Sequence, residues 1–114
     1  MHKYYKSSEE MPWVEREIPG YRYKTLGYHE KLAMVMCQSD AGFEVGLHHH
    51  PDEECIYYLK GSSEIQVGEE KFVVKAGEYV YIPADMPHSV KMLEDAEFIG
   101  ACSPPKPVYK PHDA

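Results

Sequence analysis

The stretch that decides the fold is GFEVGLHHHPDEE, which occupies residues 42–54 of a chain of 114 residues. It sets His48 and His50 at alternate positions of an expected strand, and alternate strand residues point to the same side. The Pro-Asp pair that follows breaks this strand, and Glu54 opens the next one, where it can return alongside the two histidines. Two imidazoles and a carboxylate on one wall suit a divalent transition metal, whereas two histidines alone more often mark a solvated loop.

A second informative stretch is GEYVYIPADMPH at residues 77–88. It predicts a strand that enters a proline-bounded turn, after which His88 begins another strand. A single histidine in such a place is more often a satisfied surface residue than a ligand. His88 therefore becomes a candidate fourth ligand only in company with His48, His50 and Glu54.

The rest of the chain is typical of short strands separated by glycine and proline turns. No window carries an apolar pattern of helical period over ten or more residues. Short strands at regular spacing indicate a β-sandwich or barrel. The expected strands are 21–26, 31–38, 44–48, 54–59, 64–67, 71–74, 79–82, 89–92 and 97–102.

The length fits one domain, a β-barrel over residues 21–103. An arm of residues 1–20 precedes it, and its two prolines leave room for one helical turn at most. A proline-rich tail of residues 104–114 follows, which we expect to be extended and loosely held.

Composition excludes several classes of function. Lys plus Arg number 12 and Asp plus Glu number 19, and the net charge of −7 repels nucleic acid and anionic lipid. No apolar run approaches the roughly 20 residues that cross a bilayer, and no secretory signal is expected. Three cysteines without CxxC spacing indicate a reducing, cytoplasmic setting, with Cys37 and Cys55 as small buried apolar residues.

Taken together, the two histidine stretches resemble the two motifs of the cupins. The first is Gly42-x5-His48-x-His50-x3-Glu54-x6-Gly61, and the second is Gly77-x5-Pro83-x-Asp85-x2-His88. The short span between them is similar to that of small single-domain cupins. The resemblance is close over residues 42–92, although Asp85 stands where the family usually has glycine. It implies an all-β double-stranded β-helix, a jelly-roll barrel with an extended N-terminal arm.

The resemblance also implies one divalent transition metal (Fe, Mn, Ni, Co or Zn), with coordination positions left for water, substrate or dioxygen. Glu53 is the nearest rival to Glu54, but strand alternation points it to the other side. His49 is likewise expected to face away. The metal ligands carried over from the family are His48, His50, Glu54 and His88.

The end of the chain resembles the small cupins that process unsaturated uronates during pectin and alginate breakdown. Their last strand ends in Asp-x-Phe-Ser-Pro-x-Arg, and Ser103-Pro104 matches its Ser-Pro. Gly100 stands at the Asp position, so the acid/base carboxylate is missing. Cys102 stands at the Phe position, as a cavity residue or simply a buried one. Lys106 stands at the Arg position and keeps a positive charge for a substrate carboxylate.

The predicted catalytic residues are Tyr58, Cys102 and Lys106. Tyr58 and Tyr81 are the tyrosines expected to present a hydroxyl to the cavity. The predicted function is a metal-binding cupin enzyme that acts on a small polar or anionic molecule by isomerase or lyase chemistry, with the metal as Lewis acid. The alternatives are a non-haem metal dioxygenase and a non-catalytic module that binds a metal or small ligand.

A small-molecule substrate is the expected partner, and a homodimer is the expected assembly. Small cupins commonly dimerise with N-terminal arms crossing to the partner, and Trp13 lies in such an arm. An arm that folds back on its own barrel is the alternative. Sheet edges of a small barrel need covering in either case.

Overall fold

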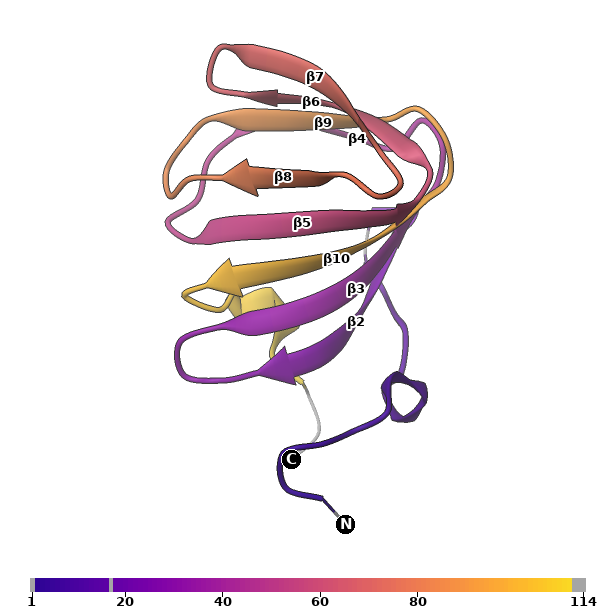
Figure 1. Cartoon of the computed structure of the whole chain (residues 1–114), viewed down its shortest axis with the longest axis vertical. Coiled ribbons are helices and arrows are strands. Elements are labelled where there is room, and N and C mark those ends of the chain that lie inside the picture. The colour runs from indigo at the N-terminus through magenta and orange to yellow at the C-terminus, as the bar shows by residue number, and fades with distance from the viewer. Residues whose placement is uncertain (1, 17, 112–114) are drawn as a thin grey trace.

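Two antiparallel sheets make up the computed structural model, which describes residues 2–16 and 18–111 (Figure 1). The larger sheet has the order β1-β2-β3-β10-β5-β8, and the smaller has the order β4-β9-β6-β7. The sheets face each other and enclose the core, so the all-β jelly-roll expectation is confirmed. The strands are β1 (Val14–Glu15), β2 (Tyr21–Tyr28), β3 (Ala33–Ser39), β4 (Glu44–His48), β5 (Glu53–Lys60), β6 (Ser62–Val67), β7 (Glu70–Lys75), β8 (Tyr79–Ile82), β9 (His88–Met92) and β10 (Ala96–Ser103).

All nine expected strands are present. The strands at 44–48 and 79–82 have the expected ends, and the others differ by one or two residues at an end. Alternation in these strands comes from one face packing on the core while the other meets solvent. The short β1 was not expected, because two residues carry no recognisable period.

The inner face of the larger sheet carries Cys37, Tyr58 and Phe98. Tyr58 is 1% exposed, and its ring stacks on Phe98 with 5.0 Å between centroids. Cys37 is buried, as predicted, but the prediction for Cys55 is wrong. Cys55 is exposed on the outer face, with its Sγ 3.7 Å from the Tyr79 hydroxyl. Alternation predicts which residues of β5 share a face, but it does not predict which of the two faces points into the barrel.

The expectation of a loosely held tail is wrong for its first part. Residues Pro107–Tyr109 form the short helix η2, and Tyr109 is 7% exposed. The Tyr23 hydroxyl donates to the Val108 carbonyl at 3.0 Å, and the Thr25 hydroxyl donates to the Tyr109 carbonyl at 2.7 Å. The strand side chains thus hold this proline-rich segment through the carbonyls of Val108 and Tyr109.

The N-terminal arm begins with the short helix η1 (Ser8–Glu10), capped by Ser7. Farther along, β1 extends the larger sheet of its own chain, with Val14 opposite Tyr23. Lys24 places its amine 4.7 Å from the centre of the Trp13 ring. Part of the arm therefore covers the sheet edge in the same chain. None of the helices in the described part of the chain is long and apolar enough to cross a membrane.

Candidate metal centre

Three histidines converge at one end of the barrel. His48 closes β4 and His88 opens β9, and the two are paired across the strands. Their rings lie 4.2 Å apart between centroids, and the His50 ring lies 4.7 Å from that of His88. A ligand nitrogen of each histidine lies within 4.8 Å of those of the other two. The first motif and His88, 38 residues after His50, thus meet through ordinary strand pairing.

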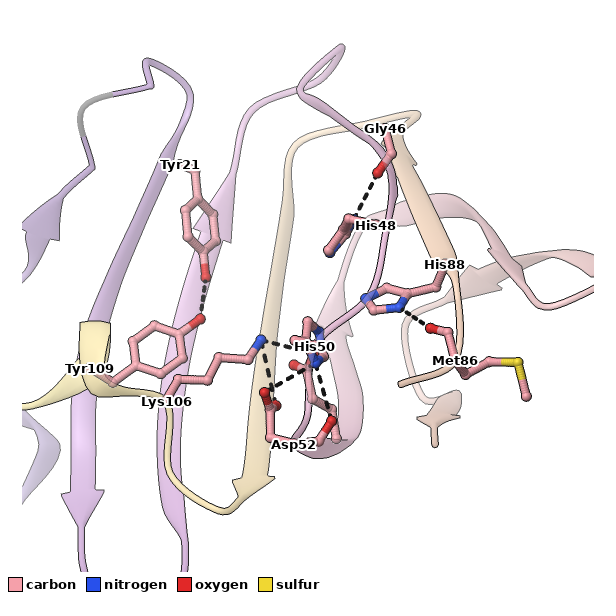
Figure 2. A network of polar contacts seen from close by, with 10 residues as sticks. Tyr21, Gly46, His48, His50, Asp52, Met86, His88, Lys106 and Tyr109 are labelled. Atoms are coloured by element: carbon pink, nitrogen blue, oxygen red, sulfur yellow. Dashed lines mark hydrogen bonds and ion pairs between the residues drawn. The ribbon is translucent and has the colours of Figure 1, made fainter. Parts of the chain in front are cut away.

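Backbone carbonyls orient all three imidazoles in the same way. His48 Nδ1 lies 2.7 Å from the Gly46 carbonyl, and His88 Nδ1 lies 2.8 Å from the Met86 carbonyl (Figure 2). His50 Nδ1 lies 3.1 Å from the carbonyl of Asp52. A carbonyl only accepts, so each Nδ1 carries a hydrogen, and in the neutral imidazole each Nε2 then presents a lone pair. Metal-binding histidines are held in this way by their outer hydrogen bonds.

Glu54, near the start of β5, joins the cluster through His50. Its Oε1 lies 2.8 Å from His50 Nε2. His50 Nε2 is buried and has no hydrogen-bond partner of acceptable geometry among the residues described. Two lone-pair atoms that approach so closely fit a cation shared between them. The donor set of imidazole nitrogens and carboxylate oxygen therefore suits a divalent transition metal.

Asp52 is a site residue that sequence reasoning missed, because it was treated only as the end of a strand. It is 4% exposed, and its Oδ1 lies 3.1 Å from His50 Nδ1. Burial raises the pKa of Asp52, and the positive charge of Lys106 lowers it in part. With His50 and Glu54 it forms a second group that can hold a cation. The sequence did offer one signal for this role, because Asp52 is an acid only two residues after the candidate ligand His50.

Lys106 reaches the cluster from the tail. Its Nζ lies 3.0 Å from Glu54 Oε1 and 3.8 Å from Asp52 Oδ2, and Figure 2 shows its side chain extended toward Asp52. Cys102 is buried opposite Glu54 in the strand register. Burial raises the pKa of Cys102, and the backbone of Lys106 lowers it in part. Lys106 thus faces the site with its charge balanced by carboxylates.

The two predicted tyrosines lie on opposite sides of the sheet. Tyr58 lines the cavity, but its hydroxyl is 2.6 Å from the Ser63 hydroxyl, and burial raises its pKa. The prediction for Tyr81 is wrong. It is 43% exposed and donates to Glu53 at 2.8 Å on the outer face. Its neighbours Val80 and Ile82 point inward instead. His49 also points outward, toward Asp85.

A cavity of about 180 Å³ lies between the sheets beside the cluster. His48, His88, Glu54 and Lys106 line one part of it, and apolar side chains such as Ile65 line much of the rest. Sites for drug-sized molecules have about 300–1,000 Å³. The cavity is therefore suited to a smaller molecule that reaches the cluster through mostly apolar surroundings.

Comparison with known proteins gives a consistent picture. The family described as cupin domain matches residues 35–100, more than half of the chain. The oxalate decarboxylase OxdC of Bacillus subtilis is 34% identical over 82 residues, which cover 67% of this chain and 21% of the decarboxylase. A solved structure of the B. subtilis oxalate decarboxylase, described for its Mn(II) centres, has a TM-score of 0.72 at 25% identity, covering 86% of this chain and 28% of that one.

Two further proteins are similar to this chain. Quercetin 2,3-dioxygenase of B. subtilis is 30% identical over 98 residues, which cover 74% of this chain and 28% of the dioxygenase. KdgF from a Halomonas species has a TM-score of 0.82 at 24% identity, covering 91% of this chain and 96% of that one, and this likeness concerns the fold. The chain spans only 21% and 28% of the length of the decarboxylase and the dioxygenase.

Proposed function

The chain belongs to the cupin family, and on that basis we propose that it is a metalloenzyme acting on a small polar or anionic molecule. One observation carries the proposal: three imidazoles, each fixed at Nδ1 by a backbone carbonyl, turn their Nε2 atoms toward one point. Glu54 places a carboxylate oxygen 2.8 Å from Nε2 of His50, the histidine that it shares with this cluster. The proposed ligands are His48, His50, Glu54 and His88.

The proposed reaction is an isomerisation or a lyase step on a carbonyl or uronate-like compound. A divalent metal in this position supplies Lewis acidity toward a substrate oxygen. The residues of the chain then have separate tasks. Lys106 lines the cavity, and its ion pairs with Glu54 and Asp52 hold these two acids beside the histidines. Asp52 and the backbone carbonyls hold the imidazoles in place, and the apolar walls restrict water.

The second candidate function is a dioxygenase. The likeness to quercetin 2,3-dioxygenase favours it, and a set of three histidines and one glutamate suits iron as well as manganese. A non-catalytic binding module is the remaining alternative, because Gly100 leaves the barrel without the acid that its uronate-processing relatives use. We propose Mn or Fe as the native metal, since the decarboxylase structure is described for its Mn(II) centres.

The experiment that tests the proposal is metal analysis of protein purified without added metals. We expect about one equivalent of Mn or Fe, and turnover of a small organic acid or uronate that stops on chelation and returns with metal. Oxygen consumption during turnover would select the dioxygenase. Protein that binds no divalent metal at neutral pH contradicts the proposal.

We also propose that two copies associate through the outer face of the larger sheet. Register places two apolar rows across this face, one with Met34, Ala101, Cys55 and Tyr81, the other with Met36, Ile99, Tyr57 and Tyr79. Contiguous apolar surface of this kind is typical of protein interfaces. Met34, Tyr57, Tyr79 and Tyr81 are each more than 40% exposed in the single chain.

A further inference from the structure

The cavity has a second polar end, distant from the histidines. Arg16, Tyr21 and Ser39 line it there. Ser39 is paired with Ala96 on β10, whereas Glu54 is paired with Cys102 on the same strand. Ala96 and Cys102 are six residues apart on β10, and at about 3.3 Å per residue their backbones are separated by roughly 20 Å. The cavity therefore runs along the barrel rather than surrounding the histidines alone.

Ser39 is the first sign that this end receives a ligand. Its side chain is 2% exposed, and its Oγ has no hydrogen-bond partner within the described ranges 2–16 and 18–111. A buried hydroxyl without a partner is unfavourable, and native proteins rarely leave one so. Because Ser39 lines the cavity, a ligand oxygen placed there can accept its hydrogen.

Arg16 is the second, independent sign. Its guanidinium lies 5.5 Å from the centre of the Tyr21 ring, which holds it at the cavity. No ion pair joins it to another residue of the described part, whereas the other arginine, Arg22, lies 3.4 Å from Asp40. At the opposite end, Glu54 and Asp52 already balance the charge of Lys106. Arg16 is thus the cation in the lining that has no described counter-ion.

The positive charge of Arg16 affects a buried residue of the barrel, Tyr109. Burial raises the pKa of Tyr109, and Arg16 makes a smaller, opposing contribution. The hydroxyls of Tyr21 and Tyr109 lie 3.1 Å apart beside the cavity and add hydrogen-bonding capacity (Figure 2). A guanidinium, a free hydroxyl and two phenols form a suitable surround for an anion, while Phe43 and Met92 provide apolar contact nearby.

We infer that Arg16 and Ser39 bind the carboxylate of a small organic acid, whose apolar body lies along the cavity in the direction of the histidines. The part of this inference that concerns the histidine end rests on the proposed function. The carboxylate site itself rests only on Arg16, Ser39 and the tyrosine hydroxyls. Arg16, in the N-terminal arm, is then the residue that selects acids over neutral molecules.

The test compares three acids of increasing length (benzoate, phenylacetate and 3-phenylpropanoate) with their neutral amides. Binding is measured by calorimetry on the full chain, both metal-loaded and treated with chelator. We expect at least one acid to bind about tenfold or more tightly than its amide. Arg16→Gln should reduce this preference to near unity, and Ser39→Ala should reduce it several-fold. Arg22→Gln, which alters the other arginine, should leave it unchanged.

Three results would overturn the inference: no acid binds, acids and amides bind equally, or the preference survives in Arg16→Gln. A preference that disappears with the metal but persists in Arg16→Gln would place the carboxylate at the histidines instead. Arg16→Lys, which keeps the charge without the planar fork, should keep part of the preference and controls for misfolding. Metal content, measured separately, reports on the proposed function, so the two can fail independently.

Discussion

Lys106 Nζ lies 3.0 Å from Glu54 Oε1, although 52 residues separate the two in the chain. The contact connects the tail to the strand that carries the proposed acidic ligand. A cation held by His50 and Glu54 would therefore compete with Lys106 for this carboxylate. The lysine stabilises the acid when no cation is bound, and its charge opposes the arrival of one.

Replacing Lys106 tests this competition. Lys106→Met should tighten binding of Mn²⁺ or Zn²⁺ by about tenfold or more, because a positive charge close to the ligands is removed. Lys106→Arg should bind metal much as the wild type does. Lys110→Met removes an exposed lysine from the same tail and should have no effect. Titration with a competing chromophoric chelator measures the affinities, and unchanged affinity in Lys106→Met would rule out the competition.

The side chains of the three consecutive histidines diverge at the end of β4, whose last residue is His48. His50→Ala should lower metal affinity by two orders of magnitude or more, because its Nε2 faces Glu54. His49→Ala should lose little, since that side chain is exposed and turns toward Asp85. Metal retained after dialysis is the measurement. Equal losses in the two variants would show that the site involves the outer histidine as well.

The strands were predictable because each carries its own local signal. The two motifs also predicted His48, His50, Glu54 and His88 as candidate ligands, since all four lie within two short stretches of sequence. What strand parity does not reveal is which face of a sheet becomes the interior. Cys55 and Tyr81 were misjudged for that reason, and both point outward from adjacent positions on β5 and β8.

The remaining site residues depend on contacts that no local pattern records. Asp52 gains its role from the turn that buries it beside His50. Arg16 meets the cavity only because β1 pairs with β2, and Tyr109 is buried only because strand hydroxyls hold the tail. Such contacts come from tertiary packing, and the length, composition and hydrophobic periodicity of the chain do not predict single contacts of this kind.

Cys55 lies in the proposed interface between two copies, so its reactivity reports whether that interface forms. Light scattering of the wild type should give a dimer at micromolar concentration, and Tyr57→Lys should give a monomer, because an unpaired charge in an apolar interface is costly. Cys55 should react with a thiol reagent faster in this variant. Cys37 should remain unreactive in both, since it is buried and its pKa is raised to about 12. A monomeric wild type would exclude the interface.

Gly100 provides the sharpest test of the chemistry, because the resemblance to uronate-processing cupins puts an acid at this position. A Cβ added at Gly100 would meet Val35 and Ile56 at 3.8 and 3.9 Å, which is ordinary contact, so an aspartate side chain can start there without a clash. Gly100 is also one inward-facing position from Cys102, which is paired with Glu54. A carboxylate at residue 100 would therefore lie inside the barrel near the proposed ligands, in a position to transfer protons.

We expect the wild type to turn over unsaturated uronates slowly and Gly100→Asp to be at least about tenfold faster, which is modest beside the 10²–10⁴-fold typical of a placed acid or base. Gly100→Asn has nearly the same shape without the charge and should not accelerate the reaction. The variants should be less stable than the wild type, because they bury a polar group, so folding is checked by thermal unfolding before rates are compared. Loss of the conjugated double bond, followed by ultraviolet absorbance, measures turnover. Fast turnover by the wild type that Gly100→Asp leaves unchanged would show that the chain needs no acid at residue 100, and that Lys106 or another cavity group already transfers the proton.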